Sequence, residues 1–132
     1  MNVRLYTPED YPTLLTWWEG HEVAAIPKGL LPSLGVVIED DKGPILAAWL
    51  YRDADGKLGW IAWTVSRPGS PGRSVYRAVK QMLGAMEELA KEFKIPLLYA
   101  QLMQPGLRRV FESSGFIASH PVQQMTKLVL CR

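Results

Sequence analysis

Cysteine and histidine are scarce in this chain of 132 residues. Cys131 is the only cysteine, so an internal disulfide and a cluster of thiolate metal ligands are both excluded. Its penultimate position, where a chain end is expected to fray, also makes it a poor candidate for a nucleophile. His21 and His120 are the only histidines, and neither has the His-x-x-Glu-His or a similar ligand spacing. The sequence therefore predicts no metal site.

Long apolar runs and a strong charge of one sign are also missing. No window approaches the roughly 18 apolar residues of a membrane-spanning helix. The opening sequence MNVRLYTPED lacks the apolar core of a signal peptide. These two absences predict a cytoplasmic protein with no membrane partner. The formal net charge is only +2, whereas nucleic-acid binding usually needs a concentrated basic face, so we expect no nucleic-acid partner.

What the chain does contain is an ordinary globular composition. Hydrophobic residues make up 48% of it and charged residues 21%, and five tryptophans are available to fill an interior. The length is that of one ordinary domain, and no repeat, low-complexity segment or change of composition marks a boundary. We therefore expect residues 1–132 to form a single domain.

The first half of the chain has the pattern of an antiparallel meander. Residues 1–6 alternate between apolar and polar as in a short strand, and residues 7–20 combine turn residues with the apolar stripe of a helix. Three strands are predicted next, joined by the turn sequences DDKG and DADG, at Leu34–Glu39, Ile45–Arg52 and Leu58–Ser66.

The second half has the pattern of a β-α-β crossover followed by a helix and a strand. Apolar residues recur from Val75 to Phe93 at spacings of 3 and 4, which only a helix places on one face. The run IPLLYAQL (95–102) is typical of a strand covered on both faces. PGLRRVFESSGF (105–116) predicts a helix that ends at Gly115, and VQQMTKLVL (122–130) predicts a last strand. The fold class is therefore mixed α/β (α+β), with helices on a central sheet, in the order β-α-β-β-β-α-β-α-β.

The stretch SRPGSPGRS, residues 66–74, separates the meander from the long helix. If it were a linker, that helix would lose the sheet on which it must pack. The alternative is a helix start that binds an anion, with Ser70 as the N-cap, Pro71 in the first turn and Gly72 leaving the free N–H groups uncovered. Four cations near this end would favour a phosphate ligand: Arg67, Arg73, Arg77 and Lys80. Solvated arginines on an ordinary helix start remain the simpler interpretation.

The order of elements and two short motifs resemble the GNAT superfamily of acyl-CoA-dependent N-acyltransferases over nearly the whole chain. In that family, an Arg/Gln-x-x-Gly-x-Gly/Ala turn opens a long helix and holds the pyrophosphate of coenzyme A. Here RPGSPG supplies Arg67 and Gly72 at the two ends, with Ser70 at the place of the middle glycine. The resemblance implies a central mixed, mostly antiparallel sheet flanked by helices.

The second motif is LRRVFESSGF, which resembles the late helix of the family and its Tyr-Glu-Lys-x-Gly-Phe ending. Glu112, Gly115 and Phe116 stand in the matching places. Phe111 stands where many members carry the tyrosine that protonates the departing thiolate. A phenyl ring cannot donate a proton, so that step has no assigned residue here.

The resemblance also implies acetyl-CoA as the acyl donor, without a metal. The residues expected to bind it are Val65, Arg67, Gly69, Ser70, Gly72, Arg73 and Ser74. The main chain of residues 63–65 would hold the pantetheine arm and polarise the thioester carbonyl. A bulge in this strand would also bring Trp60 and Trp63, which lie three residues apart, to the same face.

Acceptor-binding and catalytic residues are less well defined. Trp17 and Trp18 are the candidates for lining an acceptor pocket, and the alternative places one in the core and the other half-exposed at the helix end. An exposed tryptophan there would favour a homodimer. Candidate bases at strand ends are Glu39, Asp40 and Asp53, although the two aspartates suit turns in any case. Candidate replacements for the missing tyrosine are Tyr99, Ser113 and Ser114, so the catalytic acid and base stay unassigned.

Two functions from different classes follow from these observations. The first is an N-acyltransferase that moves an acyl group, acetyl above all, from acyl-CoA to the amine of a small molecule or peptide. The second is a GNAT-like protein that has lost catalysis and binds coenzyme A or a protein partner, for instance one derived from a phage. Phe111 and Ser70 are the departures that favour the second.

Overall fold

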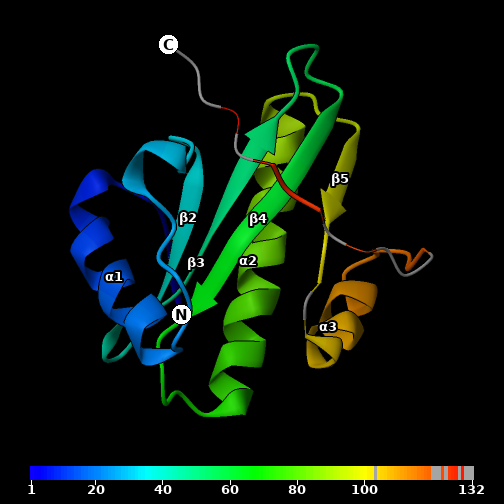
Figure 1. The fold of residues 1–132 in the computed structure, drawn as a ribbon. Coiled ribbons are helices and arrows are strands. Elements are labelled where there is room, and N and C mark those ends of the chain that lie inside the picture. Colours follow the sequence, from blue (N-terminus) through cyan, green and yellow to red (C-terminus); the bar gives the residue numbers. More distant parts are fainter. Residues whose placement is uncertain (103, 120–122, 124, 128, 130–132) are drawn as a thin grey trace.

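A five-stranded sheet in the order β1-β2-β3-β4-β5 forms the centre of the molecule. The computed structural model describes residues 1–102, 104–119, 123, 125–127 and 129. Helices α2 and α3 cover one face of the sheet and α1 the other (Figure 1). The elements are β1 Asn2–Leu5, η1 Pro8–Asp10, α1 Tyr11–Gly20, η2 Lys28–Leu30, β2 Gly35–Asp40, β3 Gly43–Arg52, β4 Leu58–Ser66, α2 Gly72–Glu92, β5 Leu97–Ala100, η3 Pro105–Leu107 and α3 Arg108–Ser113.

The strand pairing confirms the predicted meander and crossover. Strands β1 to β4 pair with their chain neighbours in antiparallel fashion, and β4 pairs with β5 in parallel. A parallel pair needs a crossover between its strands, and α2 provides it. The sheet is therefore mixed and mostly antiparallel, as the resemblance implied.

The larger core cluster lies between the sheet and α2. Val79, Met82 and Met86 are no more than 1% exposed and occupy the helix face that the 3-4 spacing predicted. They pack against alternate side chains of the strands, among them Ile38, Leu46, Leu50 and Ile61. The end of the apolar stripe differs: Phe93, the C-cap residue after Glu92, is 39% exposed.

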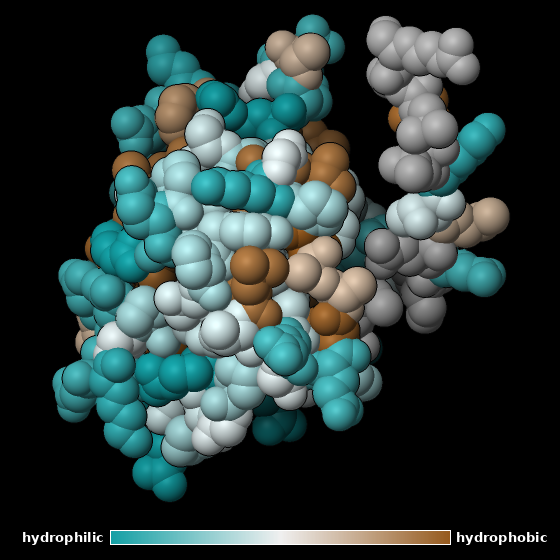
Figure 2. All heavy atoms as spheres, turned by 60° about the vertical axis from the view of Figure 1, so that its left-hand side comes forward, coloured by the Kyte–Doolittle hydropathy of each residue, from teal (hydrophilic) through white to brown (hydrophobic). Residues whose placement is uncertain are grey.

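A second, aromatic cluster fixes α1 on the opposite face. The ring of Trp49 is stacked near that of Trp18, with centroids 6.5 Å apart, and meets the ring of Tyr6 edge-on at 5.3 Å. Trp17 belongs to the same cluster. Figure 2 shows that polar side chains cover most of this side of the molecule, with a few apolar ones grouped near its middle.

Strand β5 differs from the prediction that it is covered on both faces. Leu97 is 60% exposed and Tyr99 is 41% exposed. The reason is positional, since β5 is the last strand of the described sheet and the helices pack on the opposite side chains. Residues 122, 124, 128 and 130 of the predicted last strand, 122–130, fall outside the described residues, and the other residues of that segment carry no regular secondary structure.

Helix α3 ends where Gly115 predicted it would. Gly115 has a φ of +94°, a conformation that glycine adopts without steric cost. The N–H of Gly115 donates to the carbonyl of Glu112 at 3.1 Å and the N–H of Phe116 to that of Phe111, also at 3.1 Å. These two bonds form a Schellman motif, which turns the chain away after residue 114. None of the helices formed by the described residues is both long and apolar enough to span a bilayer.

Candidate functional site

Strands β4 and β5 separate halfway along β4. Their pairing runs from Leu58 opposite Leu97 to Ile61 opposite Ala100, whereas β4 continues to Ser66. Over residues 62–66, no strand of the described sheet pairs with that edge of β4. Among the described residues, the main-chain N–H and C=O groups on this edge of β4 therefore have no strand partner.

A β-bulge occurs in β4 at the same place. Trp49 is opposite Ala62 and Ala47 is opposite Val65, so residues 63 and 64 of β4 face the single residue 48 of β3. Trp63 has a φ of +59°, which is uncommon for a bulky residue. Its ring lies 6.4 Å from that of Trp60, so the bulge brings both tryptophans to one face, as anticipated.

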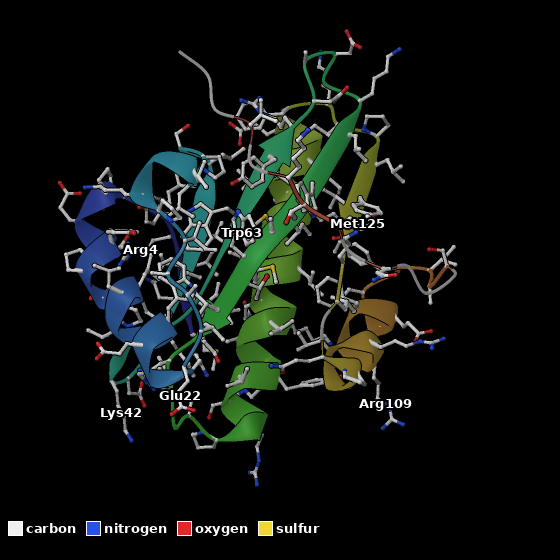
Figure 3. All side chains as sticks on the ribbon, viewed as in Figure 1. Arg4, Glu22, Lys42, Trp63, Arg109 and Met125 are labelled. Carbon is white, nitrogen blue, oxygen red and sulfur yellow. The ribbon has the colours of Figure 1, made fainter. Side chains whose placement is uncertain are left out.

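The bulge is held by a hydrogen bond that the sequence did not reveal. The indole Nε1–H of Trp63 donates to the hydroxyl of Tyr51 at 2.7 Å, and that hydroxyl donates to the carbonyl of Leu30. Figure 3 shows Trp63 over the middle of the sheet. Because Tyr51 faces Trp63 only after the register shift, no local sequence pattern could have identified this pair.

The chain turns sharply after β4 and then enters α2. The N–H of Ser70 donates to the carbonyl of Arg67 at 3.4 Å, around Pro68 and Gly69, and Gly69 has a φ of +76°. Proline followed by a glycine of positive φ is typical of a type II turn. Residues 67–71, which we call the 67–71 turn, thus connect the open end of β4 to the first residue of α2, Gly72.

The prediction that Ser70 caps α2 is wrong. The N-cap is Pro71, and no side chain bonds the first N–H groups of the helix. Ser70 is drawn into the preceding turn, where its Oγ is buried and has no hydrogen-bond partner among the described atoms. The N–H groups of Gly72, Arg73 and Ser74 consequently lack both an intrahelical acceptor and a cap.

Arg67, expected to hold a phosphate, is engaged in other contacts in this structure. Its guanidinium binds both carboxylate oxygens of Asp40, at 2.7 and 3.2 Å, and the carbonyl of Pro44 at 3.0 Å. It therefore joins the end of β4 to the β2–β3 turn. A side chain with these three contacts is not free to reach the N-terminus of α2.

Three cations remain at the start of α2. Arg73, Arg77 and Lys80 are exposed, and no carboxylate of the described residues lies within 4.0 Å of any of them. Their spacing of four and three residues places them on one side of the helix. Cations at the positive end of a helix dipole repel it, so an anion bound close by would make this arrangement more favourable.

The open space at this end agrees with an anion site. A Cβ added at Gly72 would meet nothing within 4 Å, and the same holds at Gly69. No neighbouring side chain therefore covers the backbone at Gly72, which carries one of the free N–H groups. A groove of about 650 Å³ lies elsewhere, between β1 and α2, and of the three cations only Lys80 lines it. We place the candidate site at the helix terminus because the free donors and the charges coincide there.

All three candidate bases are engaged in other contacts. The guanidinium of Arg67 holds the pKa of Asp40 below its usual value. Hydrogen bonds from Asn2 and Arg4 lower the pKa of Glu39. Backbone N–H groups after the β3–β4 turn do the same for Asp53, with Lys57 at 2.7 Å and Leu58 at 2.8 Å. A lowered pKa makes each carboxylate a weaker base, so none is favoured as the catalytic base.

These carboxylates predict how stability depends on pH. Asp10 and Asp40 each have a pKa below their usual value of 3.8, with an arginine hydrogen bond as the largest cause. Ionisation therefore stabilises the folded state fully above that value, and the stabilisation is lost as the pH falls through the lowered pKa. We expect the urea midpoint to fall steeply below about pH 4. Asp40→Asn should lower the midpoint at pH 7 and flatten this acid slope; an unchanged slope would contradict the Asp40–Arg67 contribution.

Phe111 and Ser113 supply no free proton donor at the place of the missing tyrosine. Phe111, on α3, is 3% exposed and belongs to the core cluster that includes α2. Its ring meets that of Phe116 edge-on, with centroids 5.1 Å apart. The hydroxyl of Ser113 donates to the carbonyl of Val110 at 2.7 Å, which is ordinary helix-end bonding. Tyr99 lies on β5 opposite Trp60 and is 41% exposed.

Trp17 and Trp18 are both buried, each 4% exposed. The expectation that one of them is half-exposed is therefore wrong, and neither presents a surface to an acceptor in this conformation. The argument for a homodimer from an exposed tryptophan is lost with it. Their burial is explained by the aromatic cluster, in which they anchor α1 on Trp49 and Val37.

No protein-family model and no curated protein matches the sequence. The fold does match solved structures. An acetyltransferase from Trypanosoma brucei gives a TM-score of 0.68 at 17% identity, covering 96% of this chain and 99% of that one. A predicted acetyltransferase from Clostridium acetobutylicum, solved with acetyl-CoA, gives 0.63 at 16%, covering 95% of each chain. Glucosamine-6-phosphate N-acetyltransferase from Arabidopsis thaliana gives 0.64 at 12%, covering 96% and 97%.

Identities this low establish the fold and nothing finer. The described strands follow the predicted order, the one parallel pair is β4–β5, and the bulged end of β4 leads into α2. These features and the structural matches together confirm the resemblance at the level of architecture: the chain has the fold of the GNAT acetyltransferases.

Proposed function

We propose that the protein is an acyl-CoA-dependent N-acyltransferase that uses acetyl-CoA and an amine acceptor, a small molecule or a peptide. The observation that carries the proposal is the start of α2, which follows the open end of β4 in the chain. It combines uncapped N–H groups with three cations that have no carboxylate partner among the described residues. Anions bind at such helix termini because the N–H groups and the helix dipole both attract them. The structural matches to acetyltransferases favour coenzyme A over a simple anion.

The N–H groups of residues 72–74 would hold the pyrophosphate, and Arg73 and Arg77 would neutralise it. The unpaired edge of β4, residues 62–65, would bind the pantetheine arm through main-chain hydrogen bonds. An N–H group of this edge would also polarise the thioester carbonyl. Arg67, Ser70 and Gly69 shape the turn in this proposal and Val65 contributes through its backbone, so the expected binding set is retained with altered roles.

In the reaction, the amine nitrogen attacks the thioester carbonyl carbon. The C–N bond forms, the C–S bond breaks, the nitrogen loses a proton and sulfur leaves as a thiolate. A thiol has a pKa of about 8.5, so the thiolate is a tolerable leaving group at neutral pH. Help from a general acid is typically worth about 10² to 10⁴ in rate. Without a tyrosine at position 111 we expect a slower enzyme, with water accepting and supplying protons.

Calorimetric titration with acetyl-CoA tests the binding site. We expect micromolar binding by the wild type and an affinity at least about tenfold weaker in Arg73→Ala/Arg77→Ala, because charge-assisted contacts are worth about 1.5–3 kcal/mol each. The loss should shrink at high salt. Lys57→Ala/Lys91→Ala removes the same charge at the far end of the sheet and of α2, and should bind like the wild type. A folded wild type that binds no acetyl-CoA would overturn the proposal.

The second candidate is a protein of this fold that binds coenzyme A or a protein partner without catalysis. The buried Phe111 and the paired state of Glu39, Asp40 and Asp53 favour it. A thiol-release assay with a panel of amines separates the two functions. Release that depends on an added amine supports the transferase, and tight acetyl-CoA binding with no release from any amine supports the binding protein.

A further inference from the structure

The 67–71 turn is held from two sides by residues outside it. On the sheet side, the N–H of Arg67 donates to the carbonyl of Ile45 at 2.8 Å, in addition to the ion pair with Asp40. On the other side lies the C-terminal end of α1, where Nε2 of His21 is 2.7 Å from the carbonyl oxygen of Ser66. Figure 1 shows this end of α1 beside the connection from β4 to α2.

Gly20 and Pro68 form a close contact at the same end of α1. A Cβ built on Gly20 would lie 2.6 Å from Cγ of Pro68 and 3.0 Å from its Cβ. No real Cβ approaches so closely, and the proline ring cannot rotate away as a flexible side chain would. Glycine at position 20 is therefore required for α1 to rest directly on the 67–71 turn.

The ending of α1 fixes where His21 lies. The N–H of Glu22 donates to the carbonyl of Glu19 at 3.0 Å, and the N–H of Val23 to that of Trp18 at 3.1 Å. This is a Schellman motif in which Glu22 has a φ of +57°, where glycine is usual. Since Trp18 is buried in the aromatic cluster, the core determines the end of the helix and so the position of the imidazole.

The chemistry of the His21 contact is unambiguous. A carbonyl oxygen only accepts hydrogen bonds, so Nε2 must carry the hydrogen, whether the ring is neutral or charged. Ser66 is the last residue of β4, immediately before the 67–71 turn. A bond to its carbonyl orients the peptide plane through which the chain leaves the sheet and enters the turn.

We infer that His21 and Gly20 are positioning residues for the anion site: the end of α1 presses on the 67–71 turn and orients the free N–H groups of α2. This inference rests on the proposed function of that site. The coupling is reciprocal: if the His21–Ser66 contact raises the affinity for the ligand by some factor, ligand binding must favour that contact by the same factor. Neither residue touches the anion itself.

The test combines two measurements on His21→Ala, His21→Gln and Glu19→Ala. The first is amide hydrogen exchange, by NMR on the ligand-free protein, at Arg67 and at Val75, whose N–H donates to the carbonyl of Pro71 at 3.1 Å. The second is the affinity for acetyl-CoA. We expect His21→Ala to accelerate exchange at both amides and to weaken affinity about 2- to 10-fold, the range for one hydrogen bond.

The variants separate positioning from stability. Glutamine can donate from its amide nitrogen, so His21→Gln should restore both readouts, and Glu19→Ala, an exposed change in the same turn, should alter neither. Exchange at Val37, in the middle of β2, should stay unchanged throughout. Unchanged exchange at Arg67 and Val75 in His21→Ala would overturn the inference. So would accelerated exchange with undiminished affinity. If His21→Ala accelerates exchange but the wild type binds no acetyl-CoA, the proposed function is overturned. The contact between α1 and the turn is then still established.

Discussion

Replacing Phe111 by tyrosine is expected to lower the free energy of unfolding by about 1–3 kcal/mol, the cost of burying a hydroxyl without a partner. Phe111 is 3% exposed and packs within the core formed with α2. The ring meets Phe116 edge-on. A para-hydroxyl would have to enter this close-packed region. Thermal or urea unfolding of the two proteins measures the difference.

Phe116→Tyr is the matched control for this prediction. Phe116 is only partly buried, so the same added hydroxyl can reach water and should change stability little. The rate of thiol release by Phe111→Tyr distinguishes two interpretations of α3, with position 111 either buried in the core or facing the thioester. If Phe111→Tyr were fully stable and released thiol faster, position 111 would face the thioester, and the packing of α3 described above would be wrong.

The elements of this fold were predictable because their signals are local. The turn sequences around Gly43 and Gly56, which both have positive φ, mark the two hairpins, and the 3-4 spacing marks α2. Gly115 ends α3 for the reason that the sequence suggested. The exposure of β5 was not predictable, since the apolar run of residues 95–102 does not say which neighbours the sheet supplies.

The site was only partly predictable, because its contacts link residues far apart in the chain. The cluster of cations around residue 73 is visible in the sequence. The partner of Arg67 is not, since Asp40 lies 27 residues away and reaches it only through the register of β2 and β3. The same holds for His21, which contacts Ser66 across 45 residues. Charge alone grouped Arg67 with the phosphate-binding residues, and the structure shows that its guanidinium binds Asp40 and Pro44 instead.

Gly35→Ala is expected to lower the free energy of unfolding by about 1–3 kcal/mol, the usual cost of overpacking a core. A Cβ at position 35 would lie 2.5 Å from Cδ1 and 2.8 Å from Nε1 of Trp49, and 3.1 Å from Cβ of Tyr6. The indole has no room to retreat, because Trp49 is fully buried and lies between the rings of Tyr6 and Trp18.

Gly84→Ala supplies the opposite result in the same protein. Gly84 lies within α2, and a Cβ there would meet nothing within 4 Å, so alanine should stabilise the fold by about 0.5–1 kcal/mol through helix propensity. Equal stability of the Gly35→Ala variant and the wild type would mean that Trp49 can shift, and that the aromatic cluster is looser than its contacts indicate.

Because that cluster holds Trp18 and with it the end of α1, displacement of Trp49 should also accelerate amide exchange at Arg67 under conditions where the variant is still folded. That result would show that the aromatic cluster and the 67–71 turn are structurally coupled, so that a substitution in the cluster alters the turn.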